Sequence, residues 1–210
     1  MAAPAPRPSD GAWLAAPGET LCLDFANTRF WRGSPQPTET LAGWPDLLAW
    51  FAGQAGLPAP SASSLAAWGR TDPAAAAQEF AAALALREAL YRVFAARADE
   101  LPVPAGELDR LNAAMAALPS RSDLCDVGDG FAWRVATAPS PQQLLTPVLW
   151  SAGDLLTSRR LIKVRRCANP QCVWLFLDDS KSGNRRWCSM SSCGNRAKAH
   201  RHYLKRREAR

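Results

Sequence analysis

The clearest periodic pattern in the chain predicts a long helix after Asp72. Asp72 is a suitable N-cap and Pro73 fits the first turn, and apolar residues then recur at helical spacing as far as about residue 98. The large apolar residues on one broad face are Phe80, Leu84, Leu90, Tyr91 and Phe94. We therefore expect a helix over residues 73–98 with this face in the core.

Weaker helical patterns occupy much of the rest of the first 158 residues. The predicted segments are residues 21–26, where a strand is the alternative, 45–56, a short turn at 65–68, 104–119 and 141–158. Residues 57–64, rich in Pro, Ala and Ser, are expected to be a loop. Pro147 must kink the last helix or move its start to Thr146.

A β-hairpin is predicted where Gly128-Asp129-Gly130 separates two short apolar runs, residues 124–127 and 131–135. We expect this hairpin to be the only sheet of a helical bundle spanning residues 16–158, here called the body. Residues 1–15, which begin MAAPAPRPSD, are expected to be a disordered leader.

Four of the six cysteines form two identical pairs in the last fifth of the chain. Cys167 and Cys172 enclose four residues, as do Cys188 and Cys193, and fifteen residues separate the pairs. Two such knuckles can give Zn²⁺ four thiolates in a closed structural site, although the spacing is at the long end for zinc. The alternatives are two disulfides or four buried thiols. The remaining cysteines, Cys22 and Cys125, are expected to be free thiols.

Several short words around the second pair identify a family resemblance. FLDDS (176–180), RRWCSM (185–190) and CGNRAK (193–198) resemble the bacterial CGNR zinc finger. LCLDFANT (21–28) and LREAL (86–90) resemble the ABATE domain that usually precedes this finger. The resemblance implies a stress-responsive bacterial transcription regulator with an ABATE-like body and a finger over residues 159–210.

The local pattern predicts the architecture of this finger. Apolar residues before the first pair and at 173–177 suggest a short β-hairpin, residues 178–184 a polar loop, and the second pair the start of a terminal helix. The expected module is treble-clef-like, and the fold class of the whole chain is mainly α. The body ends at residue 158 and the finger begins at residue 159, with no flexible linker between them. We therefore expect the finger to be docked on the body.

Charge is divided sharply between the two parts. The chain carries a formal +6, but residues 159–210 hold fifteen Lys and Arg against three acids, or +12, which leaves −6 for the rest. Such a segment favours a polyanionic partner, and DNA is the expected one. The candidate DNA-binding residues are Arg185, Arg186, Arg196, Lys198, Arg201, His202, Lys205 and Arg206. A solvated helix face is the alternative, and Asn195 and Arg196 could be structural.

Arg87 lies in the middle of the apolar face of the long helix, so a buried charge there needs a partner. Asp24, polar within an apolar stretch, is the predicted partner. The simpler interpretation is a structural ion pair that joins two elements. The alternative is that Asp24, Asn27, Trp31 and Arg87 line a pocket for a small-molecule effector.

These observations favour a DNA-binding regulator with one structural zinc ion. The alternatives are a zinc-thiolate redox switch and a module that docks on RNA or on proteins of the transcription machinery. An enzyme is not expected, because four thiolates leave zinc no open position and the chain has no Gly-rich phosphate loop. The absence of a membrane span or export signal suggests a cytoplasmic protein. A homodimer would strengthen DNA binding, but no heptad pattern supports it.

Overall fold

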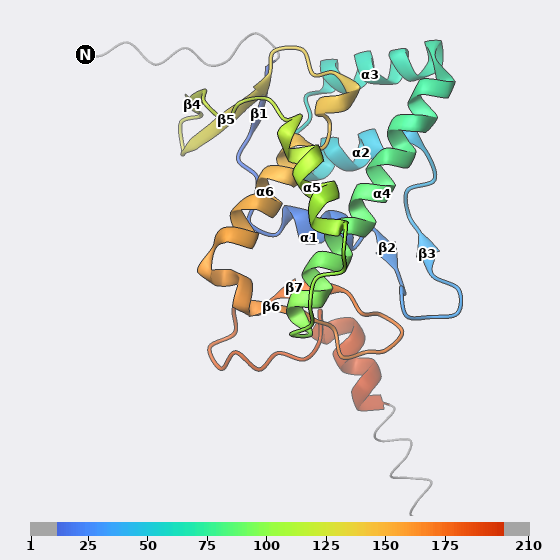
Figure 1. The fold of residues 1–210 in the computed structure, drawn as a ribbon, viewed down its shortest axis with the longest axis vertical. Coiled ribbons are helices and arrows are strands. Elements are labelled where there is room, and N and C mark those ends of the chain that lie inside the picture. Colours follow the sequence, from blue (N-terminus) through green and yellow to red (C-terminus); the bar gives the residue numbers. More distant parts are fainter. Residues whose placement is uncertain (1–11, 200–210) are drawn as a thin grey trace, which may run out of the picture.

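The computed structural model describes residues 12–199, and about half of them form helices (Figure 1). The α-helices are α1 (Leu21–Ala26), α2 (Trp44–Gln54), α3 (Ala59–Thr71), α4 (Pro73–Ala98), α5 (Glu107–Ala116) and α6 (Thr146–Thr157). Short 3-10 helices, η1 (Pro141–Gln143) and η2 (Arg159–Lys163), flank α6. The predicted mainly α fold class is confirmed.

Three small antiparallel sheets complete the fold. In the first, the strand order is β1 (Trp13–Ala15), β5 (Phe131–Ala136) and β4 (Leu124–Asp126), with Asp126 opposite Phe131 at the predicted hairpin turn. The second pairs β2 (Arg29–Phe30) with β3 (Thr38–Glu39). The third pairs β6 (Val164–Arg166) with β7 (Leu175–Leu177) in the finger.

Three sequence predictions for the body were wrong. Part of the expected leader is strand β1, anchored by Trp13, which is fully buried and donates its indole N–H to the Ala55 carbonyl at 3.0 Å. The β2–β3 pair is a further sheet in the body. Helix α3 (Ala59–Thr71) replaces most of the loop expected over residues 57–64 and extends the turn expected at 65–68; Pro60 stands in its first turn, where its missing N–H costs no helical bond.

The core is continuous from the body into the finger. Helix α4 runs along much of the molecule and packs against α1, while α1 packs against α6 (Figure 1). Five of the six residues of α1 are buried. Val164, Leu175 and Leu177 of the finger hairpin belong to the same buried cluster as these helices. The finger is therefore docked on the body, as expected from the missing linker.

The ends of the helices follow local signals. Asp72 caps α4 by accepting the Ala75 N–H at 3.0 Å, and α6 starts at Thr146 with Pro147 in its first turn. Both features agree with the sequence predictions. Among residues 12–199, no helix has the length and apolar character that crossing a membrane requires.

Candidate metal centre and domain junction

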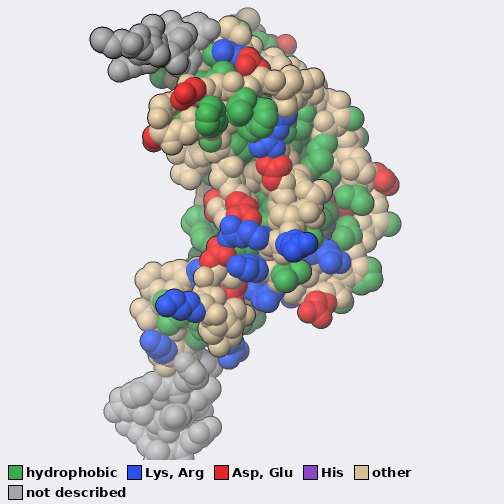
Figure 2. Space-filling model, turned by 90° about the vertical axis from the view of Figure 1, so that its left-hand side faces the viewer, with side chains coloured by type: hydrophobic (Ala, Val, Ile, Leu, Met, Phe, Trp, Pro, Cys, Tyr) green, Lys and Arg blue, Asp and Glu red, His purple; other side chains and the backbone are tan. Residues whose placement is uncertain are grey.

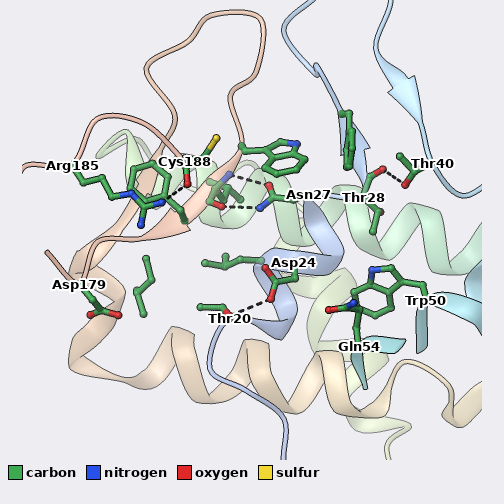
Figure 3. A pocket seen from close by; sticks show the side chains of 16 residues that line it. Thr20, Asp24, Asn27, Thr28, Thr40, Trp50, Gln54, Asp179, Arg185 and Cys188 are labelled. Atoms are coloured by element: carbon green, nitrogen blue, oxygen red, sulfur yellow. Dashed lines mark hydrogen bonds between the residues drawn. The ribbon is translucent and has the colours of Figure 1, made fainter. Parts of the chain in front are cut away.

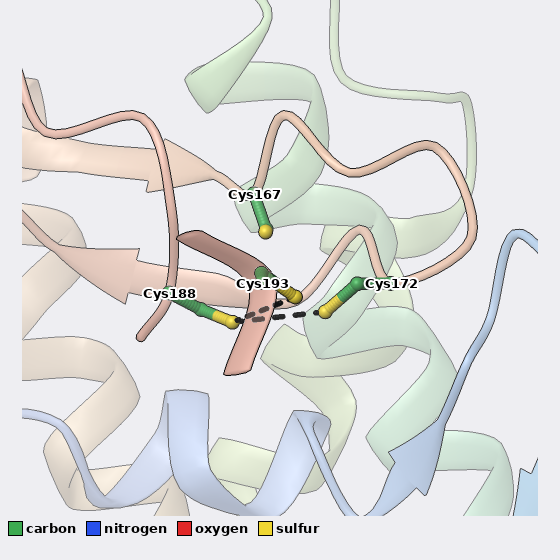
Figure 4. Close-up of side chains that lie close together, drawn as sticks. All are labelled: Cys167, Cys172, Cys188 and Cys193. Carbon is green, nitrogen blue, oxygen red and sulfur yellow. Dashed lines mark hydrogen bonds between the residues drawn. The ribbon is translucent and has the colours of Figure 1, made fainter. Parts of the chain in front are cut away.

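The four cysteines of the two pairs meet at one point in the finger (Figure 4). Cys167 follows β6 and Cys172 precedes β7, so the first knuckle closes the finger hairpin. Cys188 lies just before a helical segment that begins at Met190, and Cys193 lies within its first turn. A short hairpin followed by a helix matches the treble-clef-like prediction. The four Sγ atoms lie within 4.8 Å of one another.

The sulfur separations fit a tetrahedral zinc site. Zn–S bonds of about 2.3 Å in a tetrahedron place neighbouring sulfurs about 3.8 Å apart. The Cys172 and Cys188 sulfurs are 3.7 Å apart, and those of Cys188 and Cys193 are 3.8 Å apart. All four thiols are free, and these distances far exceed a disulfide bond of about 2.05 Å. The cluster therefore suits one four-coordinate ion, and the two-disulfide alternative does not match it.

Hydrogen-bond donors surround the sulfurs as they do around metal-bound thiolates. The side-chain amide of Asn169 donates to the Cys193 sulfur at 3.4 Å. Backbone N–H groups of Cys188 and Asn169 donate to the Cys167 sulfur. Such donors stabilise negative charge on sulfur. Sequence reasoning missed Asn169, although its Asn-Pro dipeptide is a turn signal.

The loop between the knuckles is closed by buried polar groups. Asp178, the first residue of the predicted polar loop, is buried, and its carboxylate accepts the N–H groups of Ser180 at 3.0 Å and Arg185 at 2.9 Å. The Arg185 guanidinium donates to the carbonyls of Trp187 and Cys188 and lies 4.6 Å from the Phe176 ring centroid. Arg185, predicted to bind DNA, thus holds the second knuckle in place.

The structure assigns different surroundings to the other predicted DNA-binding residues. Arg196 lies over the Trp31 ring of the body at 4.3 Å, and Arg186 lies over Trp187 at 5.4 Å. Lys198 is exposed. Arg201, His202, Lys205 and Arg206 lie outside the described residues. Basic side chains gather over the lower half of the face shown in Figure 2. The exposed basic residues of the finger that form no ion pair with a described residue are Arg159, Lys181, Arg185, Arg186, Arg196 and Lys198.

Asn27 joins the body to the finger. Its side-chain amide donates to the Leu175 carbonyl at 2.8 Å, and its side-chain oxygen accepts the Leu175 N–H at 3.0 Å. Asn27 is buried, and so is Leu175 in β7. The Asn27 side chain therefore makes the two backbone hydrogen bonds that a neighbouring strand would otherwise make to Leu175. Its role is to hold the junction between body and finger.

Other contacts across the junction involve the first knuckle. The Gly33 N–H donates to the Gln171 carbonyl at 3.1 Å, and a Cβ on Gly33 would lie 1.8 Å from the Pro170 carbonyl oxygen. The Tyr91 hydroxyl of α4 donates to the Val173 carbonyl at 2.9 Å. Arg166 forms an ion pair with Asp99 at 2.7 Å, and Phe30 packs edge-on to Trp174 at 4.7 Å. The knuckle is thus held by the body as well as by its own sulfurs.

Arg87 is buried in an ion network, but its partner is not Asp24. The guanidinium bonds both oxygens of Glu39 at 2.6 Å and pairs with Glu88 at 2.9 Å. Burial alone would raise the pKa of Glu39, but hydrogen bonds from Arg87 outweigh it and lower that pKa. The prediction that Arg87 forms a structural ion pair is confirmed, but the predicted partner was wrong. Asp24 points outward from α1 and accepts a hydrogen bond from Thr20 at 3.1 Å.

A cleft of about 570 Å³ lies between the body and the finger (Figure 3). Asp24 and Asn27 line it, as predicted for an effector pocket, but Arg87 and Trp31 do not. Arg87 is held in its ion network, and Trp31 instead borders a smaller hollow of about 190 Å³ beside the cysteine sulfurs. The predicted pocket set is therefore divided between three places.

A helical body docked on a small four-cysteine module defines a two-domain protein with a C-terminal zinc finger. Residues 19–159 match the family model ABATE, described as "Putative stress-induced transcription regulator", and residues 163–206 match the CGNR zinc finger. The chain therefore belongs to the ABATE family and carries a CGNR zinc finger, which confirms the resemblance found in the sequence. A comparison with curated proteins gives no match.

Proposed function

We propose that this protein is a transcription regulator that binds DNA through its finger, which is held together by one structural zinc ion. Cys167, Cys172, Cys188 and Cys193 would ligate the ion, and four thiolates leave no position for a substrate. The ion would supply the stability that so small a module cannot obtain from its own core. The protein is accordingly not an enzyme in this proposal.

The observation that carries the DNA proposal is the charge of the finger. Fifteen Lys and Arg face three acids over residues 159–210, and six of the described basic side chains are exposed without an ion pair to another described residue. Cations that are free of protein partners can release counterions from phosphates, which drives DNA binding. Arg185 and Arg196 are withdrawn from this surface because they bind within the finger and on Trp31. Of the predicted DNA-binding residues that the structure describes, Arg186 and Lys198 remain on this surface.

The test is a fluorescence-anisotropy titration of the zinc-loaded chain with mixed-sequence duplex DNA at two salt concentrations. Binding should weaken with salt and disappear after chelation. Lys198→Gln combined with Arg201→Gln and Lys205→Gln should weaken binding, flatten its salt dependence and leave zinc content unchanged. A matched variant, Arg110→Gln on α5 of the body, should bind as the wild type does. Equal affinity of the triple variant and the wild type would sink the proposal.

A redox switch is a second candidate, and the exposure of one ligand favours it. Cys167, Cys172 and Cys193 are buried, whereas Cys188 is only partly buried and lines the cleft. Hydrogen peroxide that reaches the Cys188 thiolate would oxidise it to sulfenic acid, with hydroxide as the leaving group, and would weaken metal binding. Zinc release under mild peroxide, with DNA affinity measured alongside, tests this. Retained zinc and unchanged DNA binding would contradict it.

A further inference from the structure

The cleft between body and finger has walls from both parts of the chain. Helix α1 contributes Asp24, α2 contributes Trp50 and Gln54, and strand β7 follows Trp174 on the finger side. In Figure 3, Asp24 lies on the cleft wall with Asn27 on one side and Trp50 and Gln54 on the other. A volume of about 570 Å³ is in the range of sites for small organic molecules.

The charged side chains that line the cleft differ in whether they already bind other groups of the protein. Asp179 is paired with Arg160 at 2.5 Å and Lys163 at 3.4 Å. Arg185 is occupied by two backbone carbonyls and the Phe176 ring. Asp24 accepts only the Thr20 hydroxyl and forms no ion pair with a described residue. The charge left for a ligand in this cleft is therefore a carboxylate.

Aromatic rings border this carboxylate and also favour a cation. Trp50 and Trp174 are partly exposed and line the cleft, and indole faces are the aromatic surfaces that attract cations most strongly. The Phe176 face is already covered by Arg185. An anion would meet Asp24 and Asp179 without a free cation to pair with. The residues that line the cleft therefore favour a cationic ligand over an anionic one.

We propose that this cleft binds a small organic ammonium ion, whose charge lies against the Asp24 carboxylate and whose apolar part packs on the indoles of Trp50 and Trp174. Such a ligand would touch body and finger at once. Its role as an effector rests on the proposed regulatory function, but its binding does not. Because Cys188 also lines the cleft, a bound ligand would restrict access to the partly buried zinc ligand.

The experiment compares two ions of similar skeleton and opposite charge, phenethylammonium and hydrocinnamate, on the zinc-loaded full chain. Isothermal titration calorimetry at low salt should give saturable binding of phenethylammonium and none of hydrocinnamate. Asp24→Asn keeps the shape of the side chain and should weaken phenethylammonium binding at least about tenfold, the loss expected for an ion pair on a partly desolvated site. Gln54→Lys should weaken it similarly by placing a competing cation on the cleft wall.

The matched control is Asp129→Asn, which makes the same charge change on the exposed β4–β5 turn and should bind phenethylammonium normally. Equal binding of the two ions, unchanged binding by Asp24→Asn and Gln54→Lys, or no binding at millimolar concentration would each overturn the proposal. DNA is absent from this titration. Failure of DNA binding therefore leaves the cleft proposal standing, and failure of ammonium binding leaves the DNA proposal standing.

Discussion

Replacing Asn27 with Ala should destabilise the junction between body and finger, because it removes two buried hydrogen bonds. The side chain satisfies both backbone groups of Leu175, with bonds of 2.8 and 3.0 Å, and both residues are buried. Without Asn27, the Leu175 N–H and C=O have no strand beside them to replace it. Each unsatisfied buried group costs about 1 to 3 kcal/mol, so Asn27→Ala, which leaves two of them, should lose about 2 to 6 kcal/mol of unfolding free energy.

The assay is urea unfolding of the zinc-loaded protein, followed by thermal unfolding. For a chain of this size a loss of 3 kcal/mol corresponds to a fall in Tm of about 6 to 12 °C. The control is Asn112→Ala on the exposed face of α5, where Ala is the better helix former and stability should be unchanged or slightly raised. A loss below about 1 kcal/mol for Asn27→Ala would refute the reasoning, because it would mean that water satisfies Leu175 as well as Asn27 does.

Four further perturbations test the packing of the junction and the network. Arg87→Met should destabilise by about 2 to 3 kcal/mol, since it leaves Glu39 without an ion-pair partner among the described residues, while Glu88 keeps Arg32 and Arg29. Because the Glu39 pKa is lowered in the folded state, its contribution is present above its unfolded pKa and is lost as pH falls through the folded pKa; Glu39→Gln should reduce this acid dependence relative to wild type. Gly33→Ala should lower Tm because its Cβ would meet the Pro170 carbonyl, whereas Gly53→Ala, with open space around it, should not. Chelating zinc should lower the Tm of the body as well as unfold the finger, since the finger hairpin is part of the core.

Each of these has a contrary outcome that is easy to recognise. Wild-type stability of Arg87→Met would show that the ion network makes no net contribution to the free energy of unfolding. Parallel acid unfolding curves for Glu39→Gln and wild type would contradict the sign of the pKa argument. Equal Tm values for the two glycine variants would contradict the close approach at Pro170. A body whose Tm ignores chelation would contradict the shared core.

The sequence predicted those elements whose signals are complete within a few residues. Asp72 and Pro73 determine the start of α4, and the Gly128 turn determines the β4–β5 hairpin. The cysteine spacing was enough to bring four sulfurs together, because a metal site depends on few residues at fixed distances. Strands β2 and β3 have two residues each, too few for any periodicity, and they pair because of contacts made elsewhere.

The partner of Arg87 could not be predicted for the same reason. Asp24 stood out as the polar residue in an apolar stretch, but α1 turns it outward to the cleft while Leu23 and Phe25 face the core. The true partner, Glu39, lies on a strand that the pattern does not indicate. Composition likewise predicted a basic finger. It could not predict which cationic side chains bind other groups of the protein, as Arg185 binds the Cys188 carbonyl.

One residue from each family word, Asn27 and Arg196, makes a contact across the junction between body and finger. Asn27 of the ABATE word holds β7, and Arg196 of the CGNR word lies over Trp31. Asp24 of α1 and Asn27, the C-cap of this helix, are three residues apart, so a cation drawn to Asp24 would act on the last turn of the helix whose cap holds the finger. A ligand that shifts this turn by a few tenths of an ångström would strain the bonds to Leu175. If this is the route, Asn27→Ala should still bind phenethylammonium but should lose any effect of that ligand on DNA affinity, whereas an effect that survives the substitution would place the coupling elsewhere, through β2–β3 and the first knuckle.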